Sequence, residues 1–296
     1  MKCKYRIIVS IDGGGIRGVL PLVILDHIQK KVSEYFEIDQ IQQCVDLYAG
    51  TSTGAIIGSA LMLQDKKGKY IYSLEKIKSL YMHRGQQIFN KTLHDSSIAS
   101  SVSPLKLVLE NNFGAYDISS IRKHFLFTSY DIVSDSPFIF MDKMERFRDV
   151  ALSKVLLACC ALPGLFTPVK FGSQELVDGI IAAKNPSMLS YDYIKLYYPN
   201  DPIILLSFGT GKLGAEKEDY IEREMQATHK QLKQISLRDP NLIYYRFQPD
   251  LNNANTEIDD TSPGNIMALE QDAFNFIANN KPLFESLYDL IEIKVA

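Results

Sequence analysis

Two glycine-rich turns near the start of the sequence constrain its fold more than any other feature. The first is Asp12–Gly18 (DGGGIRG) and the second is Gly50–Gly54 (GTSTG). Each turn follows a short apolar run and precedes a segment in which apolar residues recur at helical spacing. The expected strands are 6–11 and 45–49, and the expected helices begin at 19 and 53. A strand–turn–helix unit that occurs twice predicts a parallel sheet with flanking helices.

The rest of the chain continues this alternation. The segment Val169–Val177 alternates around Gly172-Ser173, which predicts a tight hairpin that ends at Asp178-Gly179. Further strands are expected at 125–132, 137–141, 203–208 and 244–247, and further helices at 150–161, 216–238, 265–279 and 282–291. We therefore expect an α/β protein, with residues 1–296 forming one three-layer α/β/α domain around a mostly parallel central sheet.

The segment 65–114 interrupts the alternation. It contains a charged loop, a helix-like stretch near Leu74–Leu80 and the serine-rich run Ser96–Ser103. We interpret it as an insertion over one end of the sheet that could act as a lid. An ordinary solvated connection is the alternative.

Charge and hydropathy narrow the functional classes. The net charge of −3 gives no general electrostatic reason to bind nucleic acid. The apolar run at the N-terminus is shorter than the roughly 7–15 residues of a signal-peptide core, and the longest apolar stretches, Ala55–Leu63 and Val155–Leu162, are far shorter than the roughly 20 residues of a membrane-spanning helix. We therefore expect at most peripheral membrane contact. The four cysteines form no C-x-x-C pair, which predicts reduced thiols in a cytosol-like compartment, and plain packing is expected for Cys159 and Cys160.

Ser52 is the leading candidate for a nucleophile. It lies at the centre of a G-x-S-x-G pattern, between an expected strand and an expected buried helix. Glycines at positions 50 and 54 allow a sharp bend that exposes the serine hydroxyl. A serine hydroxyl needs a base and a receptor for the oxyanion that it creates, so both must be sought elsewhere in the chain.

The first glycine turn has two interpretations. Its spacing Gly13-x-Gly15-x-x-Gly18 satisfies the dinucleotide-binding fingerprint. That site also needs an acidic residue at the end of the second strand, where this chain has Tyr48-Ala49-Gly50 instead. We therefore favour an oxyanion hole in which the amides of Gly14 and Gly15, near a helix N-terminus, offer positive partial charge.

Two residues compete for the role of general base. His229 is the only histidine after Asp178, but it lies on a polar helix face and a solvated surface position is expected for it. Asp178 lies at a strand end before Gly179, which suits either a base or a simple turn residue. No metal-binding motif occurs, so no metal and no cofactor are expected.

The D-G-G-G-x-R-G turn, the G-T-S-T-G bend and the later Asp-Gly resemble those of the patatin-like phospholipases. The resemblance extends from Ile8 to about Gly211, and it includes Ala161-Leu162-Pro163 with Phe166-Thr167-Pro168 and the run Ser207–Gly211. Two positions depart from the family pattern. Ile180 follows Asp178-Gly179 where the family has glycine or alanine, and Cys160 stands where the family often has serine.

The resemblance implies a lipid acyl hydrolase with a Ser-Asp dyad and no catalytic histidine. Carried over to this sequence, Ser52 is the nucleophile, Asp178 is the base, and Arg17 is a fixed basic residue of the turn that either steers a phosphate head group or braces the turn. The implied oxyanion residues are Gly13, Gly14 and Gly15, with Gly18, Gly50, Gly54 and Gly179 as supporting glycines.

The implied substrate is a phospholipid or another lipid ester. The expected location is cytoplasmic with peripheral membrane contact, or outside the cell as an effector without a classical signal peptide. Two rival functions stay open: a catalytically weak lipid-binding or signalling module on the same fold, and a dinucleotide-binding oxidoreductase that uses the turn Gly13–Gly18.

Overall fold

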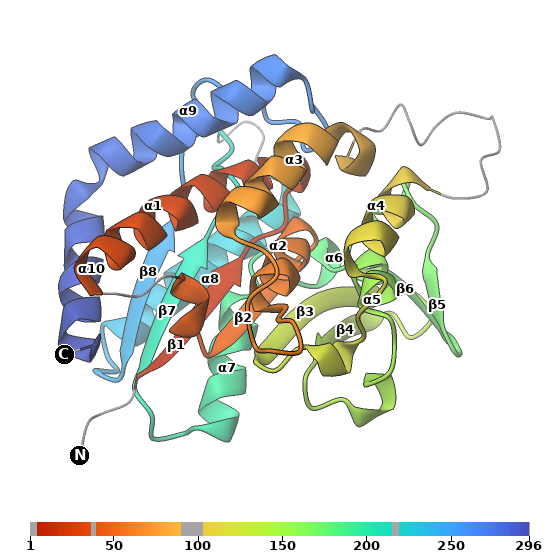
Figure 1. Ribbon diagram of the computed structural model, residues 1–296, viewed down its shortest axis with the longest axis horizontal. Coiled ribbons are helices and arrows are strands. Elements are labelled where there is room, and N and C mark those ends of the chain that lie inside the picture. Colours follow the sequence, from red (N-terminus) through yellow and green to blue (C-terminus); the bar gives the residue numbers. More distant parts are fainter. Residues whose placement is uncertain (1–4, 37–39, 90–102, 215–218, 296) are drawn as a thin grey trace.

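The computed structural model describes residues 5–36, 40–89, 103–214 and 219–295. Its centre is a mixed sheet of eight strands in the order β5-β6-β3-β2-β1-β7-β8, with β4 paired to β3 (Figure 1). The ladders among β3, β2, β1, β7 and β8 are parallel, whereas β3–β4, β3–β6 and β5–β6 are antiparallel. The strands are β1 Arg6–Ile11, β2 Leu47–Thr51, β3 His124–Asp131, β4 Ser136–Met141, β5 Val169–Phe171, β6 Gln174–Asp178, β7 Ile203–Phe208 and β8 Leu242–Phe247.

Helices cover both faces of this sheet. The α-helices are α1 Val19–Phe36, α2 Thr53–Met62, α3 Leu74–Phe89, α4 Pro104–Phe113, α5 Leu152–Cys159, α6 Ile180–Ala183, α7 Ser187–Tyr197, α8 Tyr220–Ser236, α9 Pro263–Asn279 and α10 Lys281–Val295. Short 3-10 turns are η1 Gly15–Gly18, η2 Ile41–Gln43, η4 Ile118–Ser120 and η5 Glu145–Phe147. Within the described ranges, no helix combines the length and the apolar character needed to cross a membrane.

Alternation along the central strands divides the apolar core between the two faces. In β1, Ile7 and Val9 join the larger cluster, which also contains the buried residues of α1, α2, α3, α9 and α10. Ile8 joins the smaller cluster, together with residues of α7 and α8. Alternation places successive side chains on opposite faces, so both sides of the sheet are covered. The predicted three-layer arrangement with a mostly parallel sheet is confirmed.

Most predicted elements are present, but several boundaries differ. The second strand begins at Leu47 rather than Val45, and just before it the Asp46 carboxylate accepts the Ile7 N–H at 2.9 Å. The helix expected at 150–161 is confined to Leu152–Cys159. The helix-like stretch near Leu74 extends to Phe89.

The insertion predicted at 65–114 is only partly within the described residues. Helix α3 packs on α1 and η1, and α4 packs on α3 and α5. Residues 90–102, which include most of the serine-rich run, lie outside the described part of the chain. A lid function for 65–114 therefore stays a prediction.

Two strands meet end to end along one edge of β3. Strand β4 pairs with β3 at Leu126–Asp131 and occupies one edge. The other edge pairs first with β2, which ends where Thr51 lies opposite Thr128. It then pairs with the oppositely directed β6, which ends where Asp178 lies opposite Ser129. The carboxyl ends of β2 and β6 therefore converge on neighbouring residues of β3.

Candidate active site

Ser52 lies at the bend between β2 and α2. Its backbone has φ 52° and ψ −117°, a positive φ that a residue with a side chain adopts only at a cost. The flanking glycines permit close approach of the chain: a Cβ at Gly50 would collide with the backbone of Gly54 and Ala55, and one at Gly54 with the carbonyl oxygen of Ile11. The predicted sharp strand-to-helix bend is therefore present at Ser52.

Asp178 lies directly against this serine. The Ser52 hydroxyl donates to Asp178 Oδ2 at 2.7 Å, and the Ile180 backbone N–H donates to Asp178 Oδ1 at 2.8 Å. Only 2% of Asp178 is exposed. Burial raises the pKa of Asp178 to about 7, although the hydrogen bonds from Ser52 and Ile180 favour the charged form. The site thus holds a carboxylate that can accept a proton near neutral pH.

The contact from Ile180 explains how this chain tolerates its departure from the family pattern. Asp178 is held by the backbone N–H of residue 180, which isoleucine supplies as well as glycine or alanine does. The isoleucine side chain contributes instead to the wall of the cavity beside Ser52. The sequence alone does not show whether residue 180 contacts Asp178 through its backbone or through its side chain.

The glycine turn after β1 presents amides to the same cavity, which Gly14 and Gly15 line together with Ser52. Both amides lack a hydrogen-bond partner among the described residues. The amide of Gly13 differs, because it donates to the carbonyl oxygen of Lys184 at 3.0 Å. The first turn of η1 begins at Gly15, so these free amides lie at a helical N-terminus. Two of the three glycines in the predicted oxyanion group therefore have a free N–H.

Arg17 is almost completely buried, with 2% of its surface exposed. Two of its guanidinium nitrogens, Nε and Nη1, lack a hydrogen-bond partner in the described part of the chain. Burial lowers the pKa of Arg17 to about 10, and the nearby Glu257 partly offsets this effect. The remaining motif glycines are packing positions: Gly18 lies against Thr53 and Tyr81, and Gly179 lies against Thr128.

The cavity beside Ser52 is small and largely apolar, with a volume of about 40 Å³. Helices α3 and α4 contribute Ile88, Phe89 and Leu105 to its wall, and the loop after α5 contributes Cys160 and three apolar side chains, Leu162, Leu165 and Phe166. The cysteines at 159 and 160 are buried free thiols whose pKa burial raises well above its ordinary value. Cys160 thus contacts the site in addition to packing, which the sequence did not predict.

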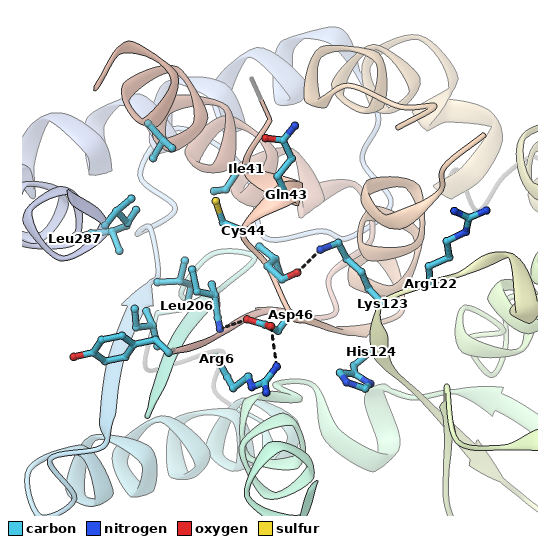
Figure 2. A pocket seen from close by; sticks show the side chains of 16 residues that line it. Arg6, Ile41, Gln43, Cys44, Asp46, Arg122, Lys123, His124, Leu206 and Leu287 are labelled. Carbon is cyan, nitrogen blue, oxygen red and sulfur yellow. Dashed lines mark hydrogen bonds and ion pairs between the residues drawn. The ribbon is translucent and has the colours of Figure 1, made fainter. Parts of the chain in front are cut away.

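A larger cavity of about 770 Å³ lies at the opposite edge of the sheet, where the central strands begin (Figure 2). Its polar groups are largely engaged with one another. Arg6 pairs with Asp46 at 3.2 Å, and Lys123 donates to the carbonyl oxygen of Val45 at 2.6 Å. Ser52 and Asp178 are not among the residues that line it. The size of a cavity alone therefore does not identify the site, and we take the smaller cavity beside Ser52 as the candidate active site.

His229, the alternative base, is separate from the site. Its Nδ1 lies 3.1 Å from the Tyr244 hydroxyl, between α8 and β8, and it does not line the cavity beside Ser52. The histidine is half-buried rather than fully solvated as predicted, and burial lowers its pKa. A Ser-Asp-His triad through His229 has no support in this geometry.

Three residues that hold the glycine turn were missed as site residues: Thr210, Lys184 and Arg246. The Thr210 hydroxyl donates to the Gly13 carbonyl oxygen at 2.7 Å. Arg246 donates to both carboxylate oxygens of Asp12, at 3.0 and 2.5 Å. Only Thr210 had a signal in the sequence, since it lies within the run Ser207–Gly211 that resembles the family.

The candidate site of this α/β fold thus consists of a serine on a strand-to-helix bend, a buried aspartate that accepts its hydrogen bond, and two glycine amides without a partner among the described residues. Residues 9–189 match the sequence model of the Patatin-like phospholipase family. The chain therefore belongs to this family.

Curated relatives agree with this membership, and a solved structure shares the fold. Patatin-like protein 2 of Arabidopsis thaliana is 28% identical over 250 residues, which cover 71% of this chain and 61% of the relative. Patatin-17 of Solanum cardiophyllum is 24% identical over 328 residues, which cover 94% of this chain and 84% of the relative. The fold is similar to that of human GIVD cytosolic phospholipase A2, with a TM-score of 0.50, 11% identity, and coverage of 98% of this chain and 60% of that one. The chain thus spans about 60% of the length of several relatives that it matches.

Proposed function

We propose that this chain is a lipid acyl hydrolase that cleaves carboxylic ester bonds through Ser52 and Asp178. The observation that carries the proposal is the 2.7 Å hydrogen bond from the Ser52 hydroxyl to a buried carboxylate whose pKa is raised to about 7. A base near neutral pKa can accept the serine proton while the serine oxygen attacks. Membership in a family of phospholipases supports a lipid substrate.

In the first step, Ser52 Oγ bonds to the carbonyl carbon of the ester and its proton passes to Asp178 Oδ2. The carbonyl oxygen becomes an oxyanion, which the free N–H groups of Gly14 and Gly15 stabilise. Collapse of this intermediate breaks the bond to the alcohol oxygen. The proton on Asp178 goes to that oxygen, and the acyl group remains on Ser52.

In the second step, water attacks the acyl carbon and gives its proton to Asp178. The same amides hold the second oxyanion. The bond to Ser52 Oγ then breaks, the serine regains a proton from Asp178, and the fatty acid leaves. One carboxylate serves both steps because it returns to its charged form after each.

The surroundings of Ser52 favour an apolar acyl group. The side chains around it come mainly from leucine, isoleucine and phenylalanine. Arg17 carries a buried positive charge beside the glycine turn, so a phosphate-bearing substrate is electrostatically compatible with the site. We therefore propose a phospholipid, reached by peripheral contact with a membrane surface.

The test combines three variants with mass spectrometry of products from mixed phospholipids. We expect Ser52→Ala to abolish fatty-acid release, Asp178→Asn to lower it by at least 100-fold, and His229→Ala to change it little. An alkyl fluorophosphonate should label wild type on Ser52 and fail to label Ser52→Ala. Hydrolysis that persists without Ser52 would contradict the proposal.

The same experiment separates the rival functions. Labelling of Ser52 without ester hydrolysis favours a catalytically weak lipid-binding module. Tight binding of NAD(P) or FAD that survives Ser52→Ala favours the dinucleotide-binding alternative. A Ser52→Ala variant with native thermal unfolding ensures that lost activity reflects lost chemistry.

A further inference from the structure

We propose that Thr210 is a positioning residue for the oxyanion hole: its hydroxyl fixes the peptide between Gly13 and Gly14 so that the Gly14 N–H points at the reacting oxygen. This inference rests on the proposed function, because it assigns a task in ester hydrolysis. Thr210 lies in the loop after β7, and 1% of it is exposed.

The geometry of the peptide between Gly13 and Gly14 sets the direction of the Gly14 N–H. The Thr210 hydroxyl donates to the Gly13 carbonyl oxygen at 2.7 Å. The described peptide bonds include no cis bond, and in a trans peptide the C=O and the following N–H point in opposite directions. Holding the Gly13 oxygen on the Thr210 side therefore turns the Gly14 N–H away from Thr210. Gly14 also lines the cavity that contains Ser52, and its N–H has no partner among the described residues.

The peptide on the other side of Gly13 is fixed as well. The Gly13 N–H donates to the Lys184 carbonyl oxygen at 3.0 Å. Lys184 is itself anchored, because its ammonium group forms a buried ion pair with Glu222 of α8. With both peptides of Gly13 held, the free rotation that glycine otherwise has is removed. Loss of the Thr210 hydroxyl removes one of these two hydrogen bonds and leaves the peptide between Gly13 and Gly14 less restrained.

Thr210 is well placed to act as a rigid anchor. The residues around it are bonded to the end of β8 and to the loop that follows: the Gly209 N–H donates to the Phe247 carbonyl oxygen at 2.8 Å and the Lys212 N–H to the Pro249 carbonyl oxygen at 2.8 Å. The approach to the glycine turn is close, since a Cβ at Gly14 would collide with the Thr210 side chain. The glycine turn and the loop after β7 are thus packed together, and the Thr210 hydroxyl makes a hydrogen bond between them.

The test compares Thr210→Ser with Thr210→Ala, two variants that both lack the methyl group and differ only in the hydroxyl. We expect Thr210→Ala to lower kcat for phospholipid hydrolysis about 10- to 100-fold with KM within about twofold, since oxyanion donors act on the transition state rather than on bound substrate. Thr210→Ser should keep kcat within about threefold of wild type. The isosteric Thr210→Val should behave like Thr210→Ala.

Two further measurements exclude a general structural effect. The rate at which an alkyl fluorophosphonate labels Ser52 should fall by the same factor as kcat in Thr210→Ala, because its phosphonyl oxygen needs the same amides. A matched control is Ser190→Ala, which removes a buried hydroxyl that donates to the Ser187 carbonyl oxygen at 2.7 Å, and which should leave kcat unchanged.

The outcomes separate this inference from the proposed function. A wild type that neither hydrolyses lipid esters nor labels on Ser52 overturns both. An active wild type whose kcat survives Thr210→Ala, or falls equally in Thr210→Ser and Thr210→Ala, overturns the role of Thr210 alone. A large rise in KM with unchanged kcat also overturns it.

Discussion

Asp178 combines a proposed role as general base with a cost in stability, because its carboxylate is buried. Its charged form lies in a buried site with no cation within ion-pair distance among the described residues. Burial raises the pKa of Asp178 from an ordinary value of 3.8 to about 7, so the folded protein binds this proton more tightly than the unfolded chain does. The contribution of the group to stability is therefore full below the unfolded pKa and is lost as pH rises to about 7.

This raised pKa predicts a particular pH profile. The deprotonated carboxylate of Asp178 is the proposed base, so kcat/KM for ester hydrolysis should increase as pH rises through about 7 and level off above it. Steady-state rates between pH 5 and 9 check this, with Ser52 labelling rates as an independent readout. An acid limb centred near pH 4, the value of an exposed carboxylate, would contradict the buried assignment.

The glycine turn after β1 is held by strands and loops that lie far from it in the sequence. Strand β8 contributes Arg246, which lies 234 positions from its partner Asp12. Asp12 is fully buried, and burial raises its pKa although Arg246 favours the charged form. Strand β8 lies beyond the residues matched to the family model, so the turn depends on a region outside residues 9–189.

Loss of Arg246 should therefore destabilise the fold. Arg246→Met leaves the buried Asp12 carboxylate unpaired, and we expect a loss of about 3–5 kcal/mol in the free energy of unfolding. Urea unfolding measures this change. The matched control is Lys170→Met, which removes an exposed ion pair with Glu175 and should cost less than about 1 kcal/mol. Equal effects of the two substitutions would contradict a structural role for the buried pair.

Most elements could be predicted because their signals are local. The hairpin β5–β6 followed from alternation around Gly172-Ser173, and α2 from an unbroken apolar helix, all of which is buried. The anchors of the glycine turn could not be predicted in the same way. Whether Arg246 reaches Asp12 depends on β8, β7 and β1 being neighbours in the sheet, and no local pattern specifies that order. Ser52 and Asp178 were proposed as a pair from the family resemblance rather than from spacing.

The size of the cavity beside Ser52 limits the access of a substrate to this residue. The cavity beside it holds about 40 Å³, far less than the roughly 300 Å³ at the lower end of ligand pockets, so an acyl chain enters only if the wall moves. Part of that wall comes from α3 and α4, the described helices of the segment 65–114.

We accordingly expect lipid to change the protection of this segment. Limited proteolysis with and without phospholipid vesicles should show altered cleavage within 65–114, whereas cleavage at the exposed hairpin turn Gly172-Ser173 should stay constant as a control. Ser52→Ala allows the comparison without turnover. Identical cleavage patterns under both conditions would indicate a passive connection.

Strands β2 and β6 meet along the same edge of β3, and this arrangement bears on how the protein could be regulated. Thr51, the residue before Ser52, lies opposite Thr128 of β3, and Asp178 lies opposite Ser129, so adjacent residues of one strand hold the proposed nucleophile next to the proposed base. In this arrangement the two groups of the proposed dyad are aligned without any bound substrate. We therefore expect any regulation of the proposed activity to act on the access of molecules to Ser52 rather than on the alignment of Ser52 with Asp178.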